Sequence, residues 1–169
     1  MSFSGGGFVT HSGIENPDSS YLKLRVALIA LDESGRVLLL NHIRPQGSYW
    51  VLPGGGLEQG ESLMEGVTRE VSEELGVSCI INRLVAVGQL ITQRITPARH
   101  VVDFFFEGSL SPGELKLTPD EGIAEARWVT ADEIDRLVIL PLEIQEVIRD
   151  LLKDRKIEFR YLGKYKIYN

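Results

Sequence analysis

The sequence has few of the features that are typical of secreted or membrane proteins. Its single cysteine, Cys79, excludes an internal disulfide and favours a reducing compartment. No apolar run approaches the roughly 20 residues that a membrane-spanning helix needs. The N-terminal residues also lack the basic-then-apolar pattern of a secretion signal. From these absences we expect a cytoplasmic protein that does not act in a membrane.

An excess of positive charge is missing as well, since 24 acidic residues outnumber 18 basic ones and the formal net charge is −6. This balance argues against a general nucleic-acid groove. Residues 153–169 differ, with six lysines or arginines and two acids, a net of +4 that leaves −10 for the rest. We interpret this basic C-terminal segment as solvated. If the substrate is an anion, something other than the net charge of the protein must attract it.

The pattern along the chain predicts one domain over residues 21–169, because no linker or internal repeat divides it. Residues 1–20, rich in Gly and Ser, are expected to form a flexible lead-in. Apolar runs at residues 22–31 and 37–43 flank a turn at 32–35 and predict a hairpin of buried strands. Further strands are expected at residues 48–52, 80–90, 100–107 and 124–129, and helices at residues 62–75, 131–137 and 142–152. Together these elements predict a mixed β-sheet with helices packed on it.

The helix expected in the glutamate-rich segment 54–77 has clear limits. Ser62 and Glu65 fit a capping box at its start, and Gly76 supplies the stop at its end. At 100° per residue its apolar side chains form one stripe, which we expect to be buried. The members of this stripe are Met64, Val67, Val71 and Leu75.

Three carboxylates lie along the margin of that stripe. Glu70, Glu73 and Glu74 share an arc of about 100°, whereas Glu65 lies on the opposite side. The ordinary interpretation of such a run is a solvated acidic face. However, Glu70 and Glu74 repel each other at i,i+4 spacing by roughly 0.2–0.5 kcal/mol, and carboxylates grouped beside a core need a counter-charge. Because Mg²⁺ takes oxygen ligands of this kind and often bridges them to substrate phosphates, we favour a metal site.

The spacing of residues around these carboxylates is specific. Gly55 is followed after five residues by Glu61, and after seven more by the run REVSEELGV at residues 69–77. Seven exact matches to a fixed pattern arise by chance on the order of 10⁻⁸ per starting point. This pattern, preceded by the run WVLPG at residues 50–54, resembles the box of the Nudix (MutT-like) hydrolase family. The resemblance implies an α/β fold, an α/β/α sandwich with a mixed β-sheet packed between helices.

The same resemblance implies an enzyme that hydrolyses a nucleoside diphosphate linked to another moiety, with Mg²⁺ or Mn²⁺ as cofactor and a small nucleotide as substrate. The implied catalytic and metal-binding residues are Glu70, Glu73 and Glu74. The Gly55 carbonyl would be a further ligand, and Glu61 and Arg69 would pair to hold the loop against the helix. Such metals neutralise phosphate oxygens and acidify a bound water, whose proton a carboxylate accepts. The cations would thus supply the attraction to phosphates that the net charge lacks.

Further candidates for site residues lie outside the box. Members of the family often recruit another acid from a later loop, and Glu121 in the run PDEG is the best-placed candidate for a metal ligand. Arg44 could clamp a phosphate, with Arg94 and Arg99 as alternatives. Trp50 could stack on a nucleotide base, although an aromatic residue beside a strand is often part of the core.

The sequence leaves the substrate open among a nucleoside triphosphate, a nucleotide sugar and a compound of the ADP-ribose type. A proline at a set distance past the box is associated with ADP-ribose hydrolases of the family. Gln93 occupies that position here, and the next proline is Pro97. The arginine-rich pattern expected of coenzyme A hydrolases is absent from residues 38–53.

Two other functions compete with hydrolysis as interpretations of the sequence. A Nudix domain that binds a nucleotide as a sensor without cleaving it usually loses box carboxylates, and this sequence keeps them all. An isoprenoid diphosphate isomerase needs a suitably placed reactive cysteine, whereas Cys79 directly follows the box and enters a predicted strand. The sequence is compatible with either a monomer or a homodimer.

Overall fold

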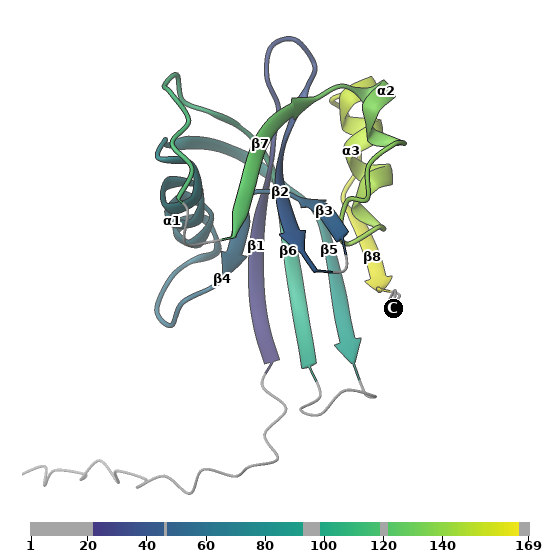
Figure 1. The fold of residues 1–169 in the computed structure, drawn as a ribbon. Coiled ribbons are helices and arrows are strands. Elements are labelled where there is room, and N and C mark those ends of the chain that lie inside the picture. Colours follow the sequence, from purple (N-terminus) through teal and green to yellow (C-terminus); the bar gives the residue numbers. More distant parts are fainter. Residues whose placement is uncertain (1–21, 46, 93–98, 119–121, 166–169) are drawn as a thin grey trace, which may run out of the picture.

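The structure is a computed structural model that describes residues 22–45, 47–92, 99–118 and 122–165 (Figure 1). The expected lead-in at residues 1–20 lies outside the described residues. In chain order the elements are β1 (Leu22–Ala30), β2 (Val37–Arg44), β3 (Gly47–Val51), β4 (Gly54–Gly56), α1 (Leu63–Leu75), β5 (Cys79–Thr92), β6 (Arg99–Leu110), β7 (Ile123–Val129), α2 (Ala131–Ile134), α3 (Ile144–Lys153) and β8 (Arg160–Lys164). Among the described residues, no helix is both long enough and apolar enough to cross a membrane.

The strands form two sheets. A five-stranded sheet has the order β4-β1-β6-β5-β8, with β1 parallel to β6, β5 parallel to β8, and the other pairs antiparallel. A three-stranded antiparallel sheet has the order β3-β2-β7. Helix α1 lies on one side of the strands, and α2 and α3 lie on the other (Figure 1). This arrangement confirms the expected α/β class with a mixed sheet between helices.

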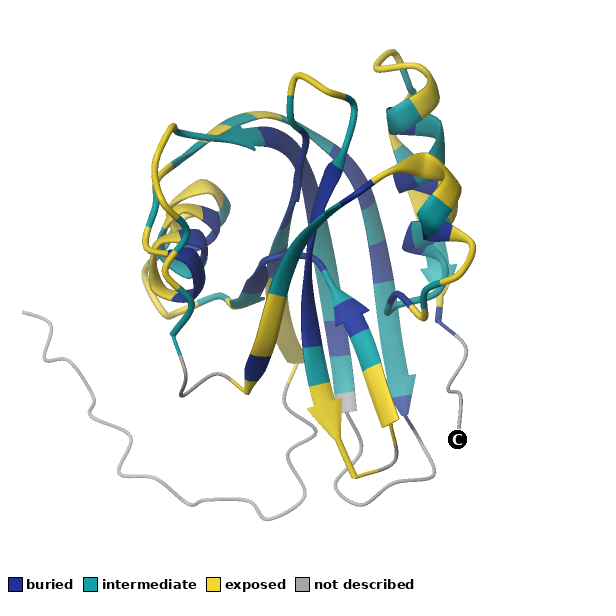
Figure 2. Ribbon diagram, turned by 45° about the horizontal axis from the view of Figure 1, so that its top comes forward, coloured by how far each residue is buried: buried dark blue, intermediate teal, exposed yellow. Residues whose placement is uncertain are grey.

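The core consists of two hydrophobic clusters that share the central strands. Along β1, Val26 and Leu28 pack in the cluster that contains the apolar stripe of α1, whereas Ile29 packs in the cluster that contains α3. Successive side chains of a strand point to opposite faces, so β1 is covered on both of them. In Figure 2 the inner side of α1 is buried and its outer side is exposed. The continuous apolar runs of the sequence thus correspond to strands that are buried on both faces.

The predicted hairpin of β1 and β2 is wrong. The turn exists, with Gly35 at φ 73° and the Arg36 N–H donating to Asp32 Oδ1 at 2.8 Å. Beyond it, however, the strands share only the bridge between Leu31 and Val37 and then diverge into different sheets. Each strand pairs instead with a partner far along the chain, β6 for β1 and β7 for β2. Pattern alone does not distinguish this arrangement from a hairpin.

Three further expectations need correction. The glycine triplet at residues 54–56, for which no strand was expected, forms β4 at the edge of the large sheet. The C-terminal segment is only partly solvated, because β8 pairs with β5 and Tyr165 after it is 4% exposed. Met64 was placed in the buried stripe of the helix, yet it is 52% exposed and lines a concavity beside Ile81 of β5.

Helix α1 begins and ends where the sequence predicts. The Ser62 N–H donates to Glu65 Oε2 at 2.8 Å, and the Glu65 N–H donates to Ser62 Oγ at 3.3 Å, which completes the capping box. Gly76 ends the helix in the left-handed conformation at φ 67°. These capped ends determine which residues of α1 face the loop that precedes the helix.

Arg83 of β5 links the segment that follows α3 to the five-stranded sheet. Its guanidinium pairs with Glu107 at 2.7 Å and donates to the carbonyls of Ile157 and Arg155 at 2.6 and 2.7 Å. Glu107 is 6% exposed, so its carboxylate depends on this partner for compensation of its charge.

We predict that Arg83→Met lowers the free energy of unfolding by about 2 kcal/mol or more, because a buried carboxylate and two carbonyls lose their donor. The matched control is Arg149→Met, since the Arg149–Asp135 pair lies largely in solvent and is expected to contribute less than about 1 kcal/mol. Urea denaturation of both variants measures the difference. Equal losses of unfolding free energy in the two variants would show that the contacts of Arg83 stabilise the fold no more than a solvent-exposed ion pair does.

Candidate active site

The glycines of β4 allow the backbone to approach α1 and β1 very closely. A Cβ atom on Gly54, whose φ is 148°, would collide with the backbone of Val26 and Ala27 in the adjacent strand. A Cβ atom on Gly55 would overlap the carboxylate of Glu70. At Gly54 only a residue without a side chain fits, whereas a Cβ atom at Gly55 would displace the Glu70 carboxylate. The backbone of β4 is therefore held directly against the carboxylates of the helix.

Glu74 is the buried member of the carboxylate group. It is 6% exposed, and its Oε2 accepts a hydrogen bond of 2.8 Å from the Gly54 N–H. This bond links the first residue of β4 to the last turn of α1. It holds the Glu74 side chain against β4 and offsets part of the cost of burying a carboxylate there. Sequence reasoning identified Glu74 but not the Gly54 N–H as its partner.

Arg69 connects the loop to the helix. Its Nε and one terminal nitrogen bind both oxygens of Glu61, at 2.6 and 3.1 Å, and the same terminal nitrogen donates to the Gly56 carbonyl at 2.9 Å. The hydrogen bond to Glu61 is the main cause of a raised pKa at Arg69. It is likewise the main cause of a lowered pKa at Glu61, followed by the N–H of Glu58. The predicted pairing of Glu61 with Arg69 is therefore present in the structure.

The remaining nitrogen of Arg69 reaches two of the helix carboxylates. It lies 2.9 Å from Glu70 Oε1 and 3.0 Å from Glu73 Oε2. The Glu70 side chain is 14% exposed and that of Glu73 is 53% exposed. Repulsion along the glutamate row is thus offset by one guanidinium placed among the side chains.

The structure brings Glu70, Glu73 and Glu74 to one side of α1 against β4, but it does not close them into a cage. Within the described ranges, no three Asp, Glu, His or Cys side chains converge on a common point as in a complete metal site. The three carboxylates point to different partners, because Arg69 binds Glu70 and Glu73, whereas the Gly54 N–H binds Glu74.

A segment that the sequence did not single out completes the last turn of α1. The N–H of Lys116 donates to the Leu75 carbonyl at 2.8 Å, and the N–H of Thr118 donates to the Glu74 carbonyl at 3.3 Å. The Thr118 hydroxyl also donates to the Glu73 carbonyl. These bonds satisfy carbonyls that a helix end leaves unpaired. No periodicity or motif in the sequence marks this contact.

The candidates outside the box have different placements. Arg44 is exposed at the end of β2, where its Nε donates to the Tyr49 hydroxyl at 3.3 Å. Trp50 lies in the core cluster at 7% exposure, with the Arg127 guanidinium 4.6 Å from its ring centroid, which favours packing over base stacking. Arg99 begins β6, but its side chain is outside the described part. Arg94 and Glu121 lie wholly outside the described residues.

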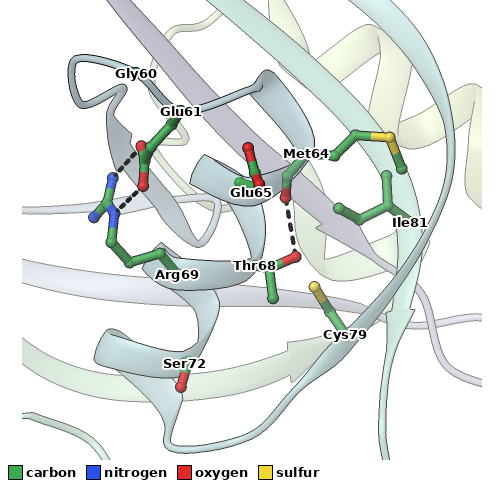
Figure 3. Close-up of a pocket in the computed structure, with 9 residues that line it drawn as sticks. All are labelled: Gly60, Glu61, Met64, Glu65, Thr68, Arg69, Ser72, Cys79 and Ile81. Atoms are coloured by element: carbon green, nitrogen blue, oxygen red, sulfur yellow. Dashed lines mark hydrogen bonds and ion pairs between the residues drawn. The ribbon is translucent and has the colours of Figure 1, made fainter.

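Cys79 lies on the flank of α1 away from the three carboxylates, next to Thr68 and Ser72 in a concavity (Figure 3). Burial raises the pKa of its thiol, which opposes formation of the thiolate. This position and protonation state do not suit the reactive cysteine that an isomerase needs.

Comparisons with known proteins agree with this geometry. The model of the NUDIX domain matches residues 22–154. An uncharacterized Nudix hydrolase of Bacillus subtilis, YvcI, is 32% identical over 126 residues, which are 72% of this chain and 75% of that protein. An ADP-ribose pyrophosphatase of Methanocaldococcus jannaschii is 29% identical over 135 residues, 79% of this chain and 76% of that protein. For several further relatives, the match spans only 30% to 64% of their own length.

A solved structure supports the same assignment. The crystal structure of a NUDIX hydrolase from Nitrosomonas europaea superposes with a TM-score of 0.68 and 26% sequence identity, over 84% of this chain and 77% of that chain. The family model covers most of the chain and includes the whole site built by β4 and α1. The chain therefore belongs to the Nudix hydrolase family.

Proposed function

We propose that this protein is a metal-dependent hydrolase that cleaves the pyrophosphate linkage of a nucleoside diphosphate joined to another moiety. The observation that carries the proposal is the position of Glu70, Glu73 and Glu74 on one side of α1, pressed against the glycine backbone of β4. The similarity to an ADP-ribose pyrophosphatase of M. jannaschii supports this class of substrate. A sensor that only binds nucleotides has no need for three intact carboxylates at this place.

The chemistry of the donor set fits a hard divalent cation. The acceptor groups that face β4 from the helix are carboxylate oxygens, and soft ligands are not among them. Mg²⁺ or Mn²⁺ would be held by these carboxylates, with the Gly55 carbonyl as a further ligand. Glu121 is an additional candidate, although it lies outside the described residues. When bound, such a cation neutralises phosphate oxygens and lowers the pKa of a water molecule beside it.

The residues of the chain supply position and proton acceptance. Glu61 holds the Arg69 guanidinium with two hydrogen bonds, and Arg69 in turn holds one oxygen of Glu70 and one of Glu73. These bonds fix the carboxylates before substrate arrives, which is how an active site avoids reorganisation during the reaction. One of the three carboxylates accepts the proton of the attacking water. Since Arg69 is engaged by carboxylates, attraction of the phosphates falls to the cation and to residues outside the box.

We predict that a panel of nucleoside triphosphates, nucleotide sugars and ADP-ribose gives two phosphorylated fragments per turnover from its best substrate. Release of free phosphate from a monoester would contradict cleavage of the pyrophosphate linkage. Reaction in ¹⁸O-labelled water should place the label in one of the two phosphate products. Absence of label from both products would exclude direct attack by water.

We predict that activity disappears in excess EDTA and returns when Mg²⁺ or Mn²⁺ is added, because carboxylates alone cannot neutralise a pyrophosphate. Turnover of the best substrate from the panel, measured before and after the addition, tests this. The melting temperature in EDTA is the control for loss of fold. A folded protein that keeps full turnover in EDTA would disprove metal dependence.

Two matched substitutions on α1 separate a catalytic carboxylate from a structural one. We expect Glu74→Gln to lower kcat by about 10²- to 10⁴-fold, because it removes a charge from the proposed metal face. Its fold should survive, since the amide oxygen of Gln can still accept the bond from the Gly54 N–H. Relief of the repulsion between Glu70 and Glu74 favours the helix by a few tenths of a kcal/mol.

The control is Glu65→Gln on the opposite side of the helix. There the side chain caps α1 by accepting from the Ser62 N–H, and Gln can accept the same bond. We expect kcat to change less than about twofold and the melting temperature to fall only slightly. The measurements are kcat at saturating metal and thermal unfolding of both variants. Equal activity of the two would mean that the carboxylate row is a solvated face.

A further inference from the structure

One row of cross-strand partners on the five-stranded sheet carries charged residues beside apolar ones. We call it the polar row, and it runs through Gly56 of β4, Arg25 of β1, Asp103 of β6 and Gly88 of β5. Since Val26 packs under α1, the side chains of Arg25 and Asp103 lie on the opposite face of the sheet. The next pair on that face, Ala27 and Phe105, packs in the cluster that contains α3. A charged pair therefore borders the core on this face.

Arg25 and Asp103 form an ion pair in the polar row. The Arg25 Nε lies 3.6 Å from Asp103 Oδ1, and the two side chains are 48% and 15% exposed. Burial raises the pKa of Asp103, and the charge of Arg25 opposes that rise. Apolar residues in such a place are often no less stable, because removing an ion pair from water is costly. The pair is therefore better explained by a function of the guanidinium than by the stability of the sheet.

Tyr165 contacts the polar row from the side of β5. A Cβ atom on Gly88 would lie 2.4 Å from the Tyr165 ring, so the ring lies directly on the backbone of β5 at the position that pairs with Asp103. The Tyr165 N–H donates to the Gln89 carbonyl at 2.7 Å, and the residue is 4% exposed. Burial, followed by the charge of Asp103, raises the pKa of the Tyr165 hydroxyl. The phenol therefore stays protonated and is a donor available to the Asp103 carboxylate.

Open space lies over the β4 end of the polar row. A Cβ atom on Gly56 would have no atom of the described residues within 4 Å, apart from those of its two chain neighbours. This position shares the face of Arg25, whereas a Cβ atom on Gly55 would meet the Glu70 carboxylate on the α1 side. Figure 1 shows β4 next to α1 at the edge of the large sheet. Because the Cα atoms of antiparallel partners are about 5 Å apart, a group that lies over Gly56 is within reach of Arg25.

The charge of Arg25 suits an anionic group in that space. Arg69, which also lies beside β4, is shared among three carboxylates, whereas Asp103 is the ion-pair partner of Arg25 within the described part of the chain. A guanidinium binds phosphate oxygens through two parallel N–H bonds. Since the Nε of Arg25 lies towards Asp103, its two terminal nitrogens can turn to such a contact. A phosphate is therefore the group that this space fits best by charge.

We propose that Arg25 is a substrate-binding residue, which binds a phosphate group of the nucleoside diphosphate over Gly56. The inference rests on the proposed hydrolysis of such a linkage. Asp103 is a positioning residue, because it keeps a long, half-exposed side chain in one orientation, and Tyr165 in turn orients Asp103. Sequence reasoning did not single out Arg25, since one arginine within an apolar strand belongs to no motif.

The first test is the affinity of the full chain for inorganic pyrophosphate, measured by calorimetry at saturating Mg²⁺. Pyrophosphate has the two phosphate groups without a nucleoside, so it isolates the proposed contact. We expect Arg25→Gln to raise the Kd by at least about tenfold, as for the loss of a hydrogen bond between charged groups. Arg25→Lys should raise the Kd less, because it keeps the charge but loses the paired donors.

The matched control is Arg36→Gln. Arg36 pairs with Asp32 at 2.7 Å, and their side chains are 42% and 17% exposed, close to the values for Arg25 and Asp103. This pair lies beyond the far end of β1, roughly 17 Å from Arg25 at 3.3 Å per residue. Since exposed charges are largely screened at that distance, the Kd for pyrophosphate should change less than about twofold. Melting temperatures confirm that every variant is folded.

The second test examines the positioning residues. We expect Asp103→Asn to raise the Kd for pyrophosphate about three- to tenfold, because binding must then immobilise an Arg25 side chain that has lost its partner. In the Arg25→Gln background the same change should alter the Kd less than about twofold, since Asp103 acts through Arg25. Tyr165→Phe keeps the ring on Gly88 and removes the hydroxyl, and it should shift the Kd in the same direction by a smaller factor. Tighter binding by Asp103→Asn would overturn the positioning role.

Failure of this proposal is distinct from failure of the proposed function. If Arg25→Gln binds pyrophosphate as well as the Arg36→Gln control does, Arg25 does not bind the phosphate, even when the chain hydrolyses its substrate. An unchanged chain that binds no pyrophosphate would overturn the proposal as well. A Kd that depends on Arg25 in a chain that hydrolyses no member of the substrate panel would support the contact and contradict the function. With the best substrate of the panel, Arg25→Gln should change KM more than kcat.

Discussion

The site depends on a single guanidinium that lies among four hydrogen-bond partners of β4, the following loop and α1. Arg69 binds Glu61, the Gly56 carbonyl, Glu70 and Glu73 at once. Without this positive charge, the carboxylates of the helix would repel each other and the loop would have no anchor. A lysine could not replace it, because its single ammonium group cannot reach partners in four directions in one plane. The positions of Glu61, Glu70 and Glu73 therefore depend on one side chain.

The second constraint is the absence of side chains in β4. Gly54 and Gly55 lie where any Cβ atom would strike β1 or the Glu70 carboxylate. The backbone of this strand at the edge of the large sheet thus contacts the carboxylates of α1 directly. The Gly54 N–H is available to Glu74 for the same reason. An exposed strand edge, which commonly invites unwanted pairing, is used here to orient a buried carboxylate.

The sequence predicted those parts of the molecule whose cause is local. The capping box of Ser62 and Glu65, the stop at Gly76, and the pairing of Glu61 with Arg69 follow from residue types at fixed spacing, and all are present. Partners that are distant along the chain could not be predicted in this way. The strands β1 and β2 were paired wrongly because a turn was taken as evidence of a hairpin, and the contact of Thr118 with α1 has no pattern at all. The exposure of Met64 likewise does not follow from the helical period, which places it in one stripe with the buried Val67 and Val71.

The pairing of β8 with β5 affects how the chain acquires its fold during synthesis. Both β1 with β6 and β5 with β8 are parallel pairs between distant segments, and such pairings form slowly. Until residues 160–164 have left the ribosome, β5 has an unpaired edge, and Arg83 lacks the carbonyls of Arg155 and Ile157. A nascent chain that carries all of α1 therefore still exposes an incomplete sheet. Emergence of residues 160–164 is the step that pairs this edge, and a ribosome that stalls before them would present an aggregation-prone strand.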